Sequence, residues 1–210
     1  TTMIQFGRIL ALCALFLGTI PASAQAPLRL MRSPSLSPDG RYIAFSYQGD
    51  IWTVPAVGGI ATRITVHEGH DSQPVWSPDG RSIAFQSARY GNEDVFTIGL
   101  LGAPPVRLTM RSSNDRLASW ASDGRLLFTT QRTFQQVEWD PEMYAVPENG
   151  GTPERLLGAF GHHPVASPDG RFIAFYHGSS PLEREGYRGP ANLDIWLYDT
   201  ESEEYSRLTT

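Results

Sequence analysis

The sequence predicts an all-β fold, a β-propeller of about four blades, each with four antiparallel strands. Three observations predict it. One pattern of eight or nine residues occurs four times in the 210 residues, its copies are spaced like propeller blades, and each copy is followed by two further strand-like segments in the same order. With 40% hydrophobic residues, 19% charged residues, 20 Gly and 16 Pro, the composition is that of a folded, turn-rich chain.

The repeated unit is clearest in Ser37–Phe45, which reads Ser-Pro-Asp-Gly-Arg-Tyr-Ile-Ala-Phe, and it recurs at 77–85, 121–128 and 167–175. The repeated aspartates are 40, 44 and 46 residues apart, a spacing typical of blades. Pro presets the first turn position, Asp bonds local N–H groups and Gly adopts a positive φ, so a tight hairpin between the first and second strands is expected. The predicted structural turn residues are Asp39, Gly40, Asp79, Gly80, Asp123, Gly124, Asp169 and Gly170.

Two further segments complete each predicted blade. An acidic, an apolar and an aromatic residue begin the third strands, at 50–52, 94–96, 142–144 and 194–196. The fourth strands follow Gly-rich or polar turns, at 63–65, 107–109, 155–157 and 207–209. The predicted propeller occupies 25–210, with blades at about 33–66, 73–110, 117–158 and 163–210. We expect these blades to form part of a six- or seven-bladed propeller.

Residues 1–24 have the pattern of a signal peptide. Arg8 precedes an apolar run from Ile9 to Ile20, and Ala22-Ser23-Ala24 follows as a cleavage site. The run is shorter than the roughly 20 residues that span a bilayer, so no permanent membrane span is predicted. The only cysteine, Cys13, lies in this leader, and the rest of the chain has no disulfide option. The expected location is therefore the periplasm or the exterior of the cell.

The charge of the chain argues against polyanionic partners. The formal net charge is −5 at pH 7 and becomes −6 when Arg8 leaves with the leader. A negative protein repels nucleic acid and anionic membrane surfaces, so no nucleic-acid partner is predicted.

Function is expected where the repeats differ. The loops between second and third strands lengthen from blade to blade, with 5, 9, 14 and 19 positions from the repeated Phe to the acidic residue. Their arginines and aromatic residues suit the binding of peptide carboxylates and side chains. The alternative is that the aromatic residues pack against their own loops while the arginines are solvated. The candidate substrate-binding residues are Arg89, Tyr90, Arg132, Trp139, Arg184, Tyr187 and Arg188.

Catalytic and metal-binding patterns are not found in the sequence. After residue 24 it has no Gly-x-Ser-x-Gly elbow, no His-Glu-x-x-His helix and no cysteine, so catalytic residues are not predicted. All five histidines lie in or beside the variable loops. The segment from His67 to Asp71 invites a zinc hypothesis, but its spacing matches no established site. We therefore predict no metal and no cofactor.

Several stretches resemble the propeller region of tricorn-like serine peptidases, relatives of the C-terminal processing peptidases. The most specific are Ile43–Pro55, Tyr187–Asn192 and Asp194–Asp199, and the resemblance covers residues 27 to 210. It implies further blades, a PDZ domain and a serine protease core after residue 210. It also implies that the propeller guides peptides or unfolded proteins toward that core.

Two other families share the Ser-Pro-Asp-Gly-Arg repeats. One alternative is a TolB-like propeller that binds envelope proteins without enzymatic activity. In such proteins an α/β domain precedes the propeller, whereas here the first hairpin begins only about a dozen residues after the predicted cleavage site. The other alternative is the propeller of a prolyl-oligopeptidase-like hydrolase, which differs mainly in the domain that comes after the last blade.

Overall fold

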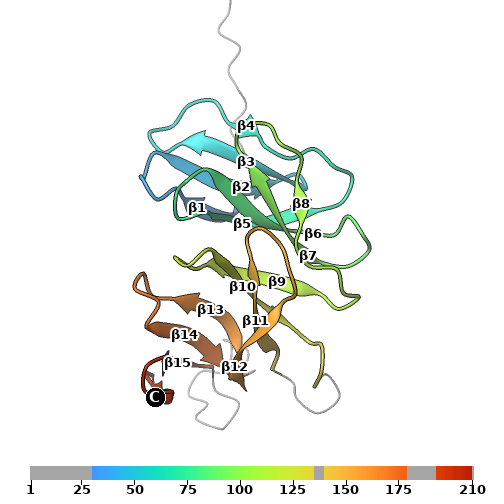
Figure 1. The fold of residues 1–210 in the computed structure, drawn as a ribbon. Coiled ribbons are helices and arrows are strands. Elements are labelled where there is room, and N and C mark those ends of the chain that lie inside the picture. Colours follow the sequence, from blue (N-terminus) through green and yellow to red (C-terminus); the bar gives the residue numbers. More distant parts are fainter. Residues whose placement is uncertain (1–29, 135–139, 179–192, 210) are drawn as a thin grey trace, which may run out of the picture.

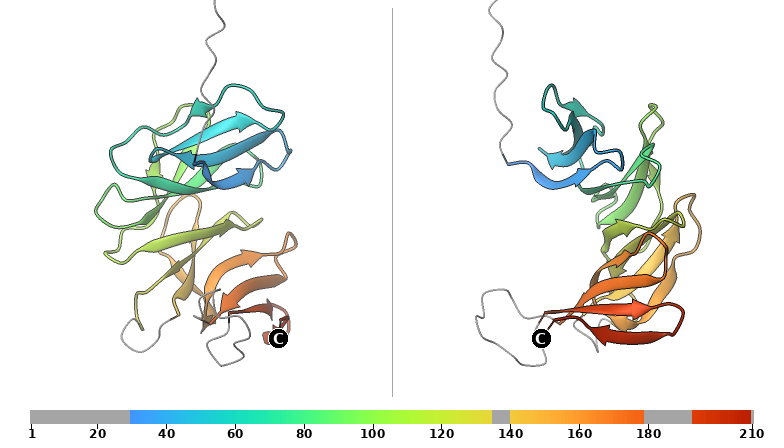
Figure 2. Two further views of the ribbon diagram at one scale, coloured as in Figure 1. Left: turned by 180° about the vertical axis from the view of Figure 1, so that it is seen from behind. Right: turned by 90° about the vertical axis from the view of Figure 1, so that its left-hand side faces the viewer.

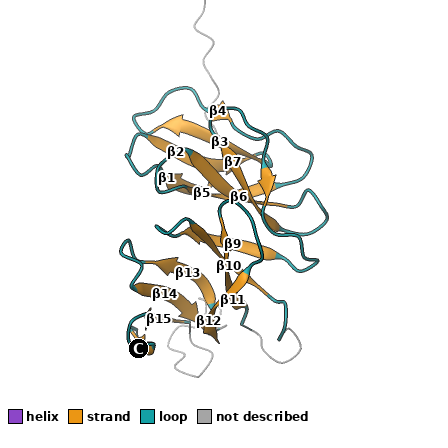
Figure 3. Ribbon diagram, viewed as in Figure 1, coloured by secondary structure: helices purple, strands orange, loops and turns teal. Residues whose placement is uncertain are grey.

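The computed structural model describes residues 30–134, 140–178 and 193–209, and these contain sixteen strands and no helix (Figures 1 and 3). The strands form four sheets, each with four antiparallel strands paired in chain order. The all-β propeller architecture predicted from the repeats is therefore confirmed. The predicted leader, residues 1–24, lies outside the described residues. Within those residues, no helix has the length and hydropathy needed to cross a membrane.

The strands of each blade follow the repeated pattern. Blade 1 contains β1 (Arg32–Leu36), β2 (Tyr42–Tyr47), β3 (Asp50–Pro55) and β4 (Thr62–Arg63). Blade 2 contains β5 (Asp71–Trp76), β6 (Ser82–Ser87), β7 (Asp94–Gly99) and β8 (Val106–Arg107). Blade 3 contains β9 (Asp115–Trp120), β10 (Arg125–Thr130), β11 (Glu142–Pro147) and β12 (Glu154–Phe160). Blade 4 contains β13 (His162–Ala166), β14 (Phe172–His177), β15 (Asp194–Asp199) and β16 (Glu204–Arg207).

A serine and an aspartate hold the hairpin between the first two strands. In blade 1 the Ser37 hydroxyl donates to an Asp39 carboxylate oxygen at 2.7 Å, and the same oxygen accepts the Arg41 N–H at 3.0 Å. These two bonds lower the pKa of the Asp39 carboxyl below its usual value. Gly40 closes the turn with a φ of 70°, which favours glycine. In blade 3, Ala121 stands where the other blades have the serine, so that hydroxyl bond is missing.

Neighbouring blades bury large side chains against small ones. Trp76 and Phe85 of blade 2 pack against Ala44 of blade 1, and Phe128 of blade 3 packs in one cluster with Ala84 of blade 2. This packing of large against small side chains explains the consecutive apolar residues of the second strands in blades 2 and 3, because other blades cover both faces of those sheets. The core is therefore divided among the spaces between blades.

The first strands bring successive blades together. β1 contacts β5, β5 contacts β9 and β9 contacts β13, as expected for the innermost strands of a propeller. Figure 2 shows the four blades as an open arc, with blade 1 (blue) at one end and blade 4 (red) at the other. One side of each blade carries the Asp-Gly hairpins and the turns between third and fourth strands. The opposite side, the variable face, carries the loops from second to third strands and the connections between blades.

Candidate functional site

In blades 1, 2 and 4, a buried aspartate at the start of the third strand forms an ion pair with an arginine of the fourth, outermost strand. In blade 2 the Arg107 guanidinium pairs with Asp94 at 2.7 Å, and the Thr109 hydroxyl accepts the Val95 N–H at 2.9 Å. Burial raises the pKa of the Asp94 carboxyl, and Arg107 only partly offsets this effect. Equivalent ion pairs join Arg63 to Asp50 in blade 1 and Arg207 to Asp194 in blade 4.

Blade 3 uses its acid differently, because it has a glutamate at this position. Glu142 accepts the N–H groups of Arg132 at 3.0 Å and Thr133 at 2.7 Å. Burial raises the pKa of Glu142, but these backbone bonds outweigh burial and the pKa is lowered. The Arg155 guanidinium does not form an ion pair with Glu142 and instead lies 5.3 Å from the Phe134 ring centre. Glu142 therefore fixes the start of the second-to-third loop of blade 3.

Two of the candidate binding arginines form buried ion pairs. Arg89 pairs with Asp71 and Arg132 with Asp115, each through two nitrogens, at 2.6 and 3.3 Å. The arginine side chains are only 10% and 6% exposed, and both aspartates are fully buried. Each pair ties the first strand of a blade to the end of its second strand. Both arginines thus direct Nε and one terminal nitrogen to an aspartate inside the protein. Their contact with a substrate stays a prediction.

The remaining candidate binding residues fall into two groups. Tyr90 is 63% exposed, its ring is parallel to Phe96 with 6.2 Å between centres, and the Arg107 guanidinium lies 4.3 Å from its ring centre. One face of Tyr90 is thus packed against its own blade, as the alternative for these loops anticipated. The other four lie outside the described residues, so their roles stay predictions: Trp139, Arg184, Tyr187 and Arg188.

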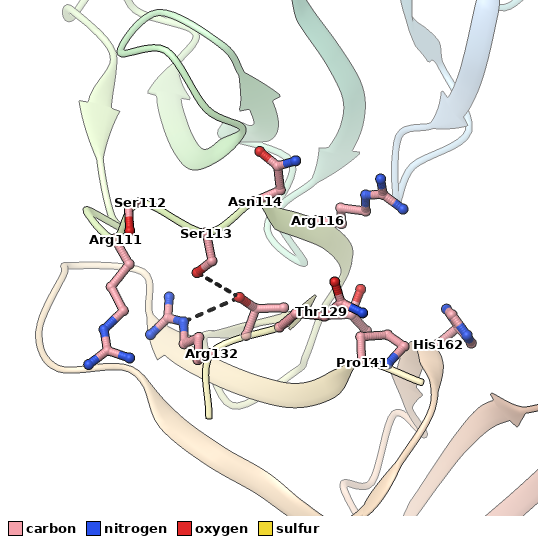
Figure 4. A pocket seen from close by; sticks show the side chains of 11 residues that line it. Arg111, Ser112, Ser113, Asn114, Arg116, Thr129, Arg132, Pro141 and His162 are labelled. Atoms are coloured by element: carbon pink, nitrogen blue, oxygen red, sulfur yellow. Dashed lines mark hydrogen bonds between the residues drawn. The ribbon is translucent and has the colours of Figure 1, made fainter. Parts of the chain in front are cut away.

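The variable face contains a pocket of 750 Å³ where blade 3 meets its two neighbours (Figure 4). The connection from blade 2 to blade 3 forms one wall, the ends of β9 and β10 form the floor, and Pro141 and the start of β13 complete it. The polar residues that line it are Arg111, Ser112, Ser113, Asn114, Arg116, Thr129, Thr130, Gln131, Arg132 and His162.

Of the three arginines that line this pocket, Arg111 makes the fewest interactions with other side chains of the described residues. It is exposed and forms no ion pair within the described part of the chain. Arg116 lies 3.5 Å from Glu93, and both side chains are accessible to solvent. Exposed pairs of this kind are weak and are readily exchanged for a ligand carboxylate. The pocket therefore offers two accessible guanidinium groups beside hydroxyl and amide groups.

The wall that carries Arg111 is held in place before any ligand binds. The Asn92 amide donates to the carbonyl oxygens of Arg111 at 2.9 Å and Ser113 at 3.1 Å. The Glu93 N–H donates to the Asn114 side-chain oxygen at 3.0 Å. These bonds hold the connection between blades 2 and 3 against the loop between the second and third strands of blade 2. A ligand would thus meet a preorganised wall, which reduces the entropic cost of binding.

The histidines do not gather into a metal site in the described residues. His162 Nε2 lies 3.4 Å from one oxygen of Asp140, and His177 Nδ1 lies 3.1 Å from the other. The His67 imidazole accepts the Gly69 N–H at 2.8 Å, which stabilises its own loop. Across residues 30–134, 140–178 and 193–209, no three His, Cys, Asp or Glu side chains are arranged to hold a metal.

Sequence reasoning missed Arg111, Arg116 and His162 as parts of one pocket. It favoured the loops between second and third strands, whereas the pocket wall is formed by the connection between blades 2 and 3. A signal for the buried ion pairs was present in the repeats. Asp71 and Asp115 both precede the hairpin aspartate by eight residues, and Arg89 and Arg132 both follow the repeated Phe by four.

Comparison with known proteins decides the family. The model of the tricorn protease N-terminal β-propeller domain matches residues 28–210. The chain belongs to this family. The crystal structure of the tricorn protease superposes on 88% of this tricorn-type propeller with a TM-score of 0.69 and 20% identity, and the match covers 18% of that enzyme. At this identity the superposition shows the shared fold.

TolB proteins are also similar to this tricorn-type propeller. The Tol-Pal system protein TolB of Francisella tularensis subsp. mediasiatica is 37% identical over 158 residues, which is 70% of this chain and 35% of that protein. The structure of a putative TolB from Agrobacterium tumefaciens has a TM-score of 0.67 and 22% identity, covering 86% of this chain and 62% of that one. The chain thus spans about a third of the length of the curated relatives it matches.

Proposed function

We propose that this propeller is a non-catalytic, substrate-handling domain of an exported tricorn-like serine peptidase. It binds peptides or segments of unfolded protein and guides them to a protease core carried, with a PDZ domain, by the same parent chain. Export is inferred from the leader pattern in residues 1–24. Membership of the tricorn propeller family supports the link to a peptidase.

The pocket beside Arg111 is the observation that carries this proposal. Planar guanidinium groups match the geometry of a carboxylate, and the Ser113 hydroxyl and Asn114 amide suit peptide N–H and C=O groups. Pockets that combine a few fixed polar groups with a preorganised wall are typical of ligand sites. We therefore assign peptide carboxylates, from acidic side chains or the chain end, to this pocket.

The replacement Arg111→Ala tests the proposal. It should weaken the binding of a rhodamine-labelled hexapeptide ending in Asp-Glu by about tenfold, the typical effect of losing one hydrogen bond to a charged group. Fluorescence anisotropy on the full chain at pH 7 and low salt measures the affinity. Arg41→Ala, on the Asp-Gly side of blade 1, is the matched control and should leave binding unchanged. Equal affinities for wild type and Arg111→Ala would contradict the proposal.

A second candidate function is that of a protein-binding propeller without a protease core. The 37% identity to a TolB protein over 158 residues favours it. In that case the variable face would recognise a folded partner, whose binding depends on a broad surface and not on one carboxylate. The same titration separates the two functions, because this candidate predicts no measurable affinity for the acidic hexapeptide.

A further inference from the structure

We propose that His162, together with Asp140 and His177, sets the charge of the Arg111 pocket and so determines how strongly the pocket prefers acidic ligands. This inference rests on the proposed function, since it concerns the specificity of the same pocket. His162 lines the pocket, whereas Asp140 and His177 are not among its lining residues and connect to it through the contact of Asp140 with His162. Figure 4 shows His162 beside Pro141, on the side of the pocket away from Arg111.

Among the described residues, three arginines line the pocket, and four carboxylates pair with them, accept their N–H groups or adjoin the lining. One of the four is Glu142, which accepts the Arg132 N–H. The formal sum is therefore one negative charge when the histidines are neutral. Arg132 pairs with Asp115, Arg116 lies beside Glu93, and Asp140 contacts the lining residue His162. Arg111 is the third arginine. The sign of the local charge therefore depends on the protonation of the histidines.

Asp140 is held so that both histidines act on it. Its side chain is only 10% exposed, and the Gly178 N–H donates to one carboxylate oxygen at 3.0 Å. The same oxygen lies 3.1 Å from His177 Nδ1, which is also 3.0 Å from the Phe160 carbonyl oxygen. A carbonyl can only accept, so His177 Nδ1 carries a hydrogen and donates. The second oxygen of Asp140 faces His162 Nε2 at 3.4 Å.

Protonation reverses the charge of this group of three. With both imidazoles neutral the group carries the single negative charge of Asp140, and with both protonated it carries one net positive charge. His162 is 34% exposed and His177 is 48% exposed, so both exchange protons with solvent. Histidine is the side chain type that can change charge between pH 5 and 8. Acidic ligands should therefore bind more tightly as the pH falls through that range.

The other charged groups nearby do not cancel this effect. His163, the next residue of β13, packs edge-on against the Tyr176 ring with 6.2 Å between centres. Burial, His162 and Arg116 lower the pKa of His163, so it remains neutral to lower pH. Arg116 and Arg132 stay charged throughout. His162 is the histidine that lines the pocket itself.

The test compares the full chain with His162→Gln at pH 8.0 and pH 5.5. Two hexapeptides serve as probes, one ending in Asp-Glu and one ending in Asn-Gln-amide. For wild type, the acidic peptide should bind about tenfold more tightly at pH 5.5, and the neutral peptide should change by less than about twofold. His162→Gln should lose most of that pH dependence. The matched control is His70→Gln, an exposed histidine outside the pocket, which should retain it.

Asp140→Asn is a second variant, and it tests the carboxylate directly. It should tighten acidic-peptide binding several-fold at pH 8.0, and circular dichroism checks that both variants are folded. The inference is overturned if wild type binds the acidic peptide equally at both pH values, or if His162→Gln keeps the full pH dependence. Either result leaves the proposed function standing. Failure of both peptides to bind at either pH would overturn the proposed function and this inference with it.

Discussion

Replacing Arg132 with alanine is expected to lower the free energy of unfolding by about 3–5 kcal/mol, the usual cost of breaking a buried ion pair. The reason is that Asp115 is fully buried, so its carboxyl would lose both its ionic partner and the hydrogen bonds that compensate its burial. Chemical denaturation of the full chain, followed by tryptophan fluorescence, measures the loss. The variant should also loosen the start of the blade 3 loop, because the Arg132 N–H is bonded to Glu142.

Arg81→Ala is the matched control for this prediction. Arg81 is 86% exposed and lies 3.9 Å from Asp79, so its removal should change the free energy of unfolding by less than about 1 kcal/mol. The double variant Arg132→Ala with Asp115→Ala should be less destabilised than Arg132→Ala alone, because no buried charge is left unpaired. Similar losses for Arg132→Ala and Arg81→Ala would contradict the structural role assigned to the buried pair.

Replacing Gly161 with alanine is expected to cost about 2–3 kcal/mol of unfolding free energy, as overpacking of a rigid contact does. A Cβ atom at Gly161 would lie 2.5 Å from the Tyr176 carbonyl oxygen and 2.6 Å from a Phe175 ring carbon. Because the first of these is a backbone atom of β14, no side-chain rotation relieves the contact. The connection from β12 to β13 would have to move away from β14.

Gly158→Ala provides the comparison for Gly161→Ala. Gly158 lies in β12, three residues before Gly161, and a Cβ atom there would meet no atom within 4 Å. It should therefore change the unfolding free energy by no more than about 0.5 kcal/mol. Thermal melts of the two variants, run side by side with wild type, measure the difference. Equal melting temperatures for the two variants would show that Gly161 does not approach β14 as closely as described.

The sequence repeats were sufficient to predict the blades because each blade needs the same local chemistry. Asp39, Gly40 and their repeats form the hairpins from bonds between residues close in sequence, so a local pattern is enough. The acid at the start of each third strand and the arginine at the start of each fourth-strand segment both recur in all four repeats. Their pairing across the sheet, as in Asp94 and Arg107, was not predicted, because it depends on which side chains face each other.

The binding pocket could be predicted only in part. Arg89, Arg132 and Arg111 are all loop arginines on the variable face, and sequence type alone does not separate them. The structure separates them by burial, since Asp71 and Asp115 engage the first two and Arg111 has no such partner among the described residues. The repeats contain part of the information that separates these arginines. Where blades 2 and 3 have these aspartates, blades 1 and 4 have Met31 and Gly161.

Mapping the peptide by NMR tests the central claim, that ligands bind on the variable face, most directly. The Asp-Glu hexapeptide is added to isotope-labelled protein, and changes in backbone amide shifts are recorded. The largest changes are expected at residues 111–116 and at His162, with little change at the hairpins around Gly40 and Gly80. Changes confined to those Asp-Gly hairpins, or an unperturbed 111–116 segment at saturating peptide, would contradict the claim.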